Sequence, residues 1–216
     1  ETPDLLSNRG IALQDLGLLD QAIASYDRAL LLNPNHRPAR FHRALALLLQ
    51  GRFEQAWPDY ELRLANEDVP PPSQRLPLWT GENIGERPLL VYGEQGIGDE
   101  MMFASCLPDV LRAYSHVVIA CTTKLEPLFR RSFPRAHVMS LNCARASPEP
   151  AGLRNAAAMI PIGSLPLHFR RSRDSFPQHD GYLMADQELA AEYRARLQAL
   201  GPGPRVGISW RGGTGR

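Results

Sequence analysis

The chain has 216 residues, of which 44% are hydrophobic and 22% charged, the balance of an ordinary globular protein. Its net charge of +1 argues against a general attraction to nucleic acid or acidic membranes. Three widely spaced cysteines without a C-x-x-C pair, and no apolar run near the roughly 18 residues of a membrane span, argue against a disulfide framework, a zinc site or a spanning segment and favour a cytoplasmic protein.

Residues 1–68 repeat with a period of 34, because GLLDQAIASY at 17–26 aligns without a gap with GRFEQAWPDY at 51–60. A fixed period of this length, with two helices joined by a glycine turn, resembles the tetratricopeptide repeat. The resemblance implies two stacked helical hairpins that recruit a partner. In the second unit Arg63 stands where the pattern has a small residue, which is typical of the last, capping unit of an array.

Residues 69–87 are predicted to be a linker, because their first part is polar and rich in proline. Trp79 within it is interpreted as a packing anchor at the domain junction.

From residue 88 the pattern alternates between short apolar runs and helical periodicity. This alternation predicts a Rossmann-like parallel α/β domain over 88–204 and a first strand of a second domain within 205–216. Strands are expected at 89–92, 116–121, 136–141, 158–162 and 206–210, and helices at 101–114 (kinked at Pro108), 124–131 and 188–200. Residues 142–180 are hard to assign.

The sequence GEQGIGDE at residues 93–100 follows the first strand and opens a helix. It therefore lies at the carboxyl edge of the sheet, where α/β proteins bind ligands. Its glycine spacing matches neither a Walker A loop nor the dinucleotide fingerprint. Asp99 and Glu100 occupy the start of the helix and would repel a phosphate there.

Asp99 is therefore the candidate general base, which would accept a proton from a substrate hydroxyl. Its alternative role is to cap the helix, and the two roles are compatible. The residues predicted to form the acceptor-binding loop beside it are Glu94, Gln95, Gly96 and Gly98, the glycines allowing close approach to the backbone.

This loop, with Met102–Ala104 and Leu107–Pro108, resembles the core motif of bacterial proteins that combine tetratricopeptide repeats with a glycosyltransferase domain. Residues 206–213 are similar to that family as well. Such proteins resemble heptosyltransferases and, in architecture, protein O-GlcNAc transferases. The resemblance implies the glycosyltransferase-B fold, in which two Rossmann-like domains face each other and the second holds most of the sugar nucleotide. It also implies that the aspartate matched by Asp99 is the base.

On this resemblance the chain holds the repeats and the acceptor-side half of the fold, with the C-terminal half missing. Because it has no initiator Met and its last residues read as a strand that runs into a glycine loop, we expect a fragment of a longer protein that neither turns over nor binds a sugar nucleotide tightly by itself.

The glycine loop near the end of the chain is the candidate phosphate site. Guanidinium, hydroxyl and N–H groups favour phosphate oxygens, and these are offered by Ser209, Arg211, Gly212, Gly213 and Thr214. The alternative is an ordinary turn after a core strand. No D-x-D sequence occurs, so neither a metal site nor a cofactor is predicted.

The leading functional hypothesis is an inverting, metal-independent glycosyltransferase that acts on a protein or glycan acceptor recruited by the repeats. The alternative is an interaction scaffold whose α/β domain is not catalytic. A dinucleotide-dependent enzyme is disfavoured by the glycine spacing. The donor sugar, the nucleotide base and the acceptor are not specified by the sequence.

Three further features are each open to two interpretations. His168 and His179 either approach the cleft or lie in loops, and the run Arg170–Arg173 either meets an anionic ligand or forms a solvated loop. The cysteines are interpreted as small buried hydrophobic residues.

Overall fold

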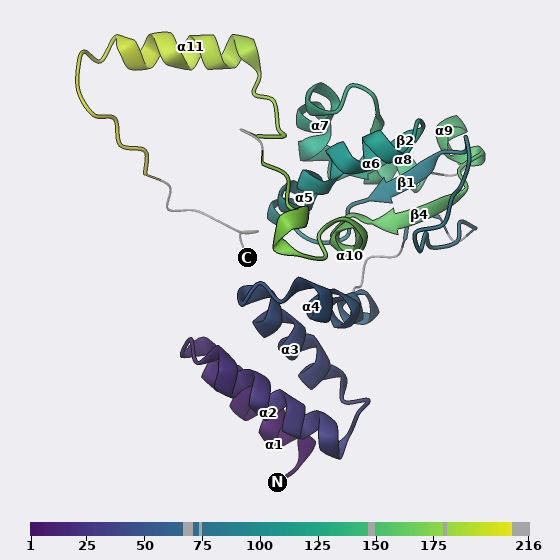
Figure 1. Cartoon of the computed structure of the whole chain (residues 1–216). Helices are drawn as coiled ribbons and strands as arrows, with labels where there is room; N and C mark the ends of the chain where they lie inside the picture. The colour runs from purple at the N-terminus through teal and green to yellow at the C-terminus, as the bar shows by residue number, and fades with distance from the viewer. Residues whose placement is uncertain (67–70, 74, 147–149, 179–180, 209–216) are drawn as a thin grey trace. The chain divides into compact units, whose positions relative to one another are not determined.

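The computed structural model describes residues 1–66, 71–73, 75–146, 150–178 and 181–208 (Figure 1). The chain forms two compact units, Glu1–Leu183 and Met184–Arg216. The first unit therefore joins the predicted repeats, the linker and most of the α/β domain in one body.

The repeats form two helical hairpins at the start of the chain (Figure 1). Their elements are α1 (Pro3–Asp15), α2 (Leu19–Leu32), α3 (Arg37–Leu49), α4 (Phe53–Tyr60) and the 3₁₀ helix η1 (Glu61–Asn66), which continues α4.

The turns inside the two hairpins have the same backbone conformation. Gly17 and Gly51 have φ angles of 75° and 74°, in the left-handed region that favours glycine. The next residues, Leu18 and Arg52, have φ/ψ of −85°/61° and −87°/60°. Each donates its N–H to the carbonyl five residues earlier at 2.9 Å, which is a Schellman ending. The 34-residue period is therefore present in the backbone and not only in the sequence.

Small residues let the helices of the first hairpin approach closely. A Cβ at Gly10 would lie only 2.4 Å from the ring of Tyr26. Tyr26, Ala22 and Ala29 have no exposed surface. The Tyr26 hydroxyl donates to Gln14 Oε1 at 3.1 Å, so the polar end of this buried ring is satisfied within the repeat.

The α/β region is built on a four-stranded parallel sheet with the order β3-β2-β1-β4. The strands are β1 (Leu89–Tyr92), β2 (Val117–Cys121), β3 (His137–Ser140) and β4 (Ala158–Pro161), which confirms four of the predicted strands. The chain adds strands on one side of β1 and then returns to its other side with β4. The topological switch point, where open α/β sheets bind ligands, therefore lies between β1 and β4.

Short helices connect the strands. They are α5 (Ile97–Phe103), η2 (Ala104–Cys106), α6 (Leu107–Ala113), η3 (Thr123–Leu125), α7 (Glu126–Ser132), α8 (Leu141–Ala144), α9 (Ala151–Arg154), η4 (Ile162–Ser164), α10 (Leu165–Phe169) and η5 (Arg173–Ser175). The helix predicted at 101–114 is interrupted by η2, just before Pro108, because proline cannot donate the backbone hydrogen bond that would continue it.

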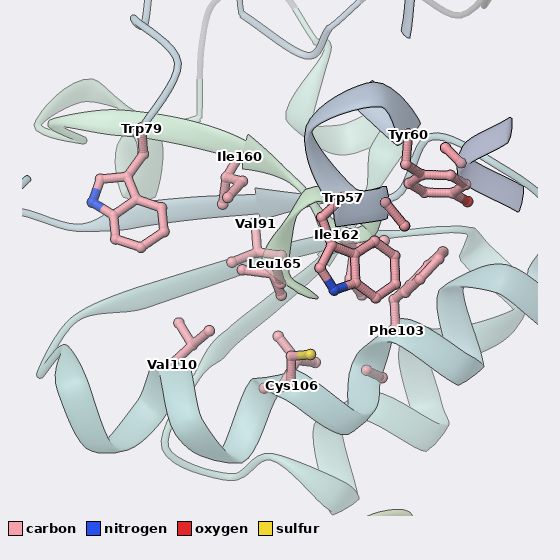
Figure 2. Packing of buried hydrophobic residues seen from close by; sticks show 14 of the residues in the cluster. Trp57, Tyr60, Trp79, Val91, Phe103, Cys106, Val110, Ile160, Ile162 and Leu165 are labelled. Carbon is pink, nitrogen blue, oxygen red and sulfur yellow. The ribbon is translucent and has the colours of Figure 1, made fainter. Parts of the chain in front are cut away.

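One hydrophobic cluster joins the repeats to the sheet. Figure 2 shows Trp57 and Tyr60 of α4 beside Phe103, Ile162 and Leu165 of the α/β region. The ring centroids of Tyr60 and Phe103 are 6.2 Å apart. The last repeat helix therefore belongs to the same core as the sheet.

The second part of the predicted linker is also docked. The Trp79 N–H donates to the carbonyl of Met159 in β4 at 2.8 Å, and the Met159 N–H donates to the carbonyl of Pro77 at 2.9 Å. Trp79 is buried, as its interpretation as an anchor requires. His168 packs against it with ring centroids 4.5 Å apart, so this histidine supports the anchor.

The second unit contains α11 (Gln187–Gln198), the helix predicted at 188–200. None of its residues is buried. Residues 206–208 are not in a strand, Val206 and Ile208 are exposed, and Ser209 and Trp210 lie outside the described residues. The predicted strand at 206–210 therefore stays a prediction. In the described part of the chain, no helix is long and apolar enough to cross a membrane.

The interpretation of the cysteines as buried holds for two of them. Cys106 and Cys121 are buried free thiols, and burial raises their pKa values to about 11 and about 12. Cys143 is exposed, contrary to the interpretation, because α8 has only one buried residue and turns this side chain outward.

Candidate functional site

The glycine loop lies at the carboxyl edge of the sheet, as predicted. It leaves β1 after Tyr92 and enters α5 at Ile97. The Gly93 N–H still donates to the carbonyl of Ala120 in β2 at 2.8 Å, so the first part of the loop is held by the sheet.

Glu100 turns into the protein. Its carboxylate accepts hydrogen bonds from the Thr122 N–H at 3.0 Å and from the Thr122 hydroxyl. Burial raises the pKa of Glu100, and these two hydrogen bonds lower it. The effect of burial is larger, so the pKa lies above its usual value. A Cβ at Gly93 would lie 2.4 Å from the Glu100 carboxyl carbon, which explains the first glycine of the loop. Glu100 is therefore a structural residue that fastens α5 to the end of β2.

Asp99 lies at the surface of the same helix. It is half-buried, and its Oδ2 accepts a hydrogen bond from the Gly96 N–H at 3.1 Å. Gly96 is the N-cap of α5, so Asp99 caps from the third helical position. The capping contact is confirmed, and it fixes the carboxylate at the edge of the sheet.

Glu94 lies inside the protein rather than in a surface loop. Its side chain is 1% exposed and pairs with Arg63, whose Nε and Nη2 donate to Glu94 Oε1 at 3.1 and 2.9 Å. The Gly163 N–H donates to the same oxygen at 3.2 Å. Burial raises the pKa of Glu94 against the lowering effect of Arg63.

Arg63 comes from η1, at the end of the second repeat. Its Nη1 donates to Glu61 at 2.6 Å, its Nη2 to the Ser164 hydroxyl at 2.8 Å, and its guanidinium lies 4.7 Å from the centre of the Tyr60 ring. Burial lowers the pKa of Arg63, but the two carboxylates outweigh it, and the net pKa lies above the usual value. Arg63 therefore stays protonated inside the protein.

These contacts fill the switch point between β1 and β4. Glu94 follows β1, whereas Gly163 and Ser164 follow β4. A Cβ at Gly163 would lie 2.5 Å from Glu94 Oε1 and 3.0 Å from Arg63 Nη2, so the buried ion pair leaves no space there. The crevice that holds nucleotides in other sheets of this type is occupied by the protein's own side chains.

The middle of the loop stays open. Gly96 and Gly98 are exposed, and Gln95 is half-buried and accepts a hydrogen bond from the Tyr60 hydroxyl at 3.3 Å. A Cβ at Gly98 would meet nothing within 4 Å, and its φ is not positive. The fold therefore does not require glycine at position 98.

The run Arg170–Arg173 and the following residues bind the second repeat. The Trp57 indole N–H donates to the carbonyl of Arg170 at 2.7 Å, and Arg171 pairs with Glu54 at 2.7 Å. Buried Arg170 pairs in turn with Asp109 at 2.6 Å. Arg170 thus docks the second repeat on the α/β region, and neither of the two interpretations holds for it, whereas residues 171–173 are exposed, as the interpretation as a solvated loop requires.

A pocket of about 320 Å³ lies between the second repeat and α5. It is lined by Leu45, Leu48, Phe53, Trp57, Tyr60, Met102, Phe103, Ser105, Cys106, Pro166, Arg170 and Phe176.

The docking residues that sequence reasoning missed are Arg63, Trp57 and Ser164. Arg63 alone gave a signal, because it departs from the small residue expected by the repeat pattern. The residues of the predicted phosphate site, Ser209, Arg211, Gly212, Gly213 and Thr214, lie outside the described residues, as does His179.

The helical hairpins and the sheet define a repeat protein joined to a parallel α/β domain. Residues 3–36 match the family model of the tetratricopeptide repeat, so the chain contains at least one such repeat.

Among known proteins, the chain is similar to Protein FlbA of the bacterium Caulobacter vibrioides (strain ATCC 19089 / CIP 103742 / CB 15), with 31% identity over 219 residues. The match covers 94% of this chain and 37% of FlbA, so the chain spans little more than a third of that relative. It is also 38% identical over 48 residues to Uncharacterized protein MJ0572 of Methanocaldococcus jannaschii, covering 22% of this chain and 56% of that protein. No solved structure matches.

Proposed function

We propose that the chain carries the repeats and the acceptor-side domain of an inverting, metal-independent glycosyltransferase, with Asp99 as its general base. One observation carries the proposal. Asp99 is a half-exposed carboxylate, fixed at the carboxyl edge of the sheet by the Gly96 N–H at 3.1 Å, next to the open backbone at Gly98.

The arrangement suits removal of a proton from an acceptor hydroxyl. Asp99 accepts one hydrogen bond from the described residues, and it does so through Oδ2. Its Oδ1 is therefore left for the acceptor. The acceptor oxygen would attack the anomeric carbon of the donor sugar as Asp99 takes its proton, and the nucleotide diphosphate would leave with the electrons of the broken bond. Glu94 and Glu100 do not compete for this role, because both are buried and hydrogen-bonded.

The closed switch point bears on where the sugar nucleotide binds. Arg63 and Glu94 fill the position in which a sheet of this type would hold a nucleotide. This supports binding of the nucleotide by a second domain, to which the basic glycine loop at 209–214 would contribute. The acceptor would be a protein, which is what tetratricopeptide repeats generally bind, or a glycan.

The test is transfer by the full-length protein from a panel of sugar nucleotides, with Asp99→Asn as the variant. We expect transfer to fall by roughly 10²- to 10⁴-fold, because the amide cannot accept the proton, while the midpoint of unfolding changes little. Asp15→Asn, at an exposed position of the first repeat, is the matched control and should transfer normally. Wild-type turnover in Asp99→Asn would remove Asp99 from the mechanism.

The second candidate is a repeat-based scaffold with a non-catalytic α/β domain. It is favoured by the structural use of this loop, in which Glu94 and Glu100 are buried and Asp99 itself caps α5. A full-length protein that binds no sugar nucleotide in calorimetric titration, yet retains a protein partner through its repeats, would support the scaffold.

A further inference from the structure

The pocket of about 320 Å³ is built from both domains. The second repeat supplies Leu45, Leu48 and Phe53, and the α/β domain supplies Met102 and Phe176 on the other side. Met102 and Phe176 are exposed, at 54% and 42%. The pocket is therefore open to solvent at an apolar rim, and its volume suits one or two side chains of a partner.

The walls of the pocket favour a hydrocarbon group over a sugar. Two polar groups of its aromatic walls are already bonded inside the protein: the Trp57 indole N–H to the carbonyl of Arg170 at 2.7 Å, and the Tyr60 hydroxyl to Gln95 at 3.3 Å. The polar exceptions among the lining side chains are Ser105 and Arg170, whose buried Nε has no partner among the described residues. A sugar placed here would lose the water on its hydroxyls and gain few partners in return, which is costly. A bulky apolar side chain loses nothing of this kind.

The pocket lies next to the proposed base. Met102 follows Asp99 by three residues on α5, so the two side chains are neighbours on one face of the helix, with Cβ atoms roughly 5–6 Å apart. A chain that places an apolar side chain in the pocket can therefore place a hydroxyl of an adjacent residue at Asp99.

Three arginines outside the pocket lie close in the chain to its lining residues Phe53, Arg170 and Phe176. The Arg173 guanidinium covers Gly51, with Nη2 2.8 Å from the position a Cβ would take there, and Arg171 pairs with the exposed carboxylate of Glu54. Arg52 binds only the neutral side chains of its neighbours among the described residues. Asp174 is exposed directly after Arg173, so these three guanidiniums stand against two carboxylates, Glu54 and Asp174, and the remaining positive charge favours an acidic group on the partner.

Resting on the proposed function, we propose that this pocket binds a bulky apolar side chain of a polypeptide acceptor. The acceptor carries a serine or threonine next to that side chain, with its hydroxyl at Asp99, and an acidic residue on the other side, at Arg171 and Arg173. The acceptor of this protein is therefore a polypeptide and not a glycan.

The test uses the full-length protein and fluorescently labelled peptides Gly-Asp-Xaa-Ser-Gly and Gly-Ser-Xaa-Asp-Gly, in which Xaa is Phe or Ala. We expect the Phe peptide to bind at least tenfold more tightly than the Ala peptide in one of the two orders, measured by fluorescence polarisation. Met102→Glu should reduce this preference to less than threefold, because it places a charge at the apolar rim. Phe176→Ser, which removes the other exposed apolar side chain of the rim, should act in the same direction.

Leu31→Glu is the matched control. Leu31 is 83% exposed on α2 and does not line the pocket, so the same change there should leave the preference intact. Equal binding of the Phe and Ala peptides by the wild-type protein would overturn the inference. So would self-association through the pocket, seen as a dimer in sedimentation that Met102→Glu dissociates without any peptide preference.

Failure of this inference differs from failure of the proposed function. Transfer to serine peptides at the same rate for both choices of Xaa would overturn the proposed role of the pocket and still support the proposed transferase activity. The opposite result is a preference for Phe that depends on Met102, without transfer from any sugar nucleotide. It would support the peptide site and overturn the proposed transferase activity. Asp99→Asn should lose transfer and keep the preference for Phe.

Discussion

The two repeats share a backbone and differ in what they bind. Residue 29 of the first repeat corresponds to residue 63 of the second. Ala29 is fully buried between helices of the repeats, whereas Arg63 is buried in an ion pair with Glu94 of the α/β domain. The same structural position thus serves close packing in one repeat and domain docking in the other.

The matched tyrosines show the same difference. The Tyr26 hydroxyl donates to Gln14 within the first repeat. The residue that corresponds to Gln14 in the second repeat is Leu48, and the Tyr60 hydroxyl donates to Gln95 of the glycine loop instead. Departures from the repeat pattern therefore mark the residues that fasten the array to its neighbour.

Replacement of Arg63 by the small residue of the pattern tests this comparison most severely. We expect Arg63→Ala to lower the free energy of unfolding by about 3–5 kcal/mol, because it leaves the Glu94 carboxylate buried without its cation. Denaturant unfolding at neutral pH measures the effect. Arg28→Ala, which breaks an exposed ion pair with Glu1, should cost less than about 1 kcal/mol.

A double variant sharpens the result. Arg63→Met combined with Glu94→Leu removes both charges, so most of the lost stability should return. A cost below 1 kcal/mol for Arg63→Ala alone would show that the pair does not hold the domains together.

The duplicated turns should respond alike to substitution. Gly17→Ala and Gly51→Ala each place a side chain at a φ near +75°, and we expect each to cost about 1–2 kcal/mol in thermal or denaturant unfolding. Gly98→Ala is the control, since its φ is not positive and its surroundings are open, and it should stay within about 0.5 kcal/mol. A much larger cost at Gly51 would mean that Arg173, which covers it, cannot move aside.

The smallest expected effect separates the two tyrosines. Tyr26→Phe and Tyr60→Phe each lose one neutral hydrogen bond, worth about 0.5–1.5 kcal/mol. Hydrogen exchange should locate the difference: Tyr60→Phe should speed exchange of the loop amides that follow Gln95, and Tyr26→Phe should not. Faster loop exchange in both variants would contradict the conclusion that only the tyrosine of the second repeat holds the glycine loop.

Local patterns predicted most of the fold. The run Leu89–Tyr92 and its three parallel neighbours were predictable because each is a short apolar segment between turns, and the 34-residue period predicted both hairpins down to Gly17 and Gly51. The rest of the segment 142–180 was not, because its helices have only three to five residues and are too short to show a period.

The candidate site was predicted in part. The carboxyl-edge position of the glycine loop follows from the order of strand and helix, and so does the cap by Asp99. The burial of Glu94 could not be predicted, because its partner Arg63 lies 31 residues earlier in a different type of domain. No local pattern shows that a polar residue in a glycine loop will be covered by a cation from a repeat.

The docking of η1 also has a consequence for recombination. Genes that exchange repeat arrays at the proline-rich segment 69–74 would separate Arg63 from Glu94 and leave both domains with an orphaned buried charge. A crossover in the turn between α2 and α3 would carry the ion pair, Trp57 and the pocket walls along together. We therefore expect the last repeat to be inherited with the α/β domain, and the interchangeable part of the array to end before Arg37.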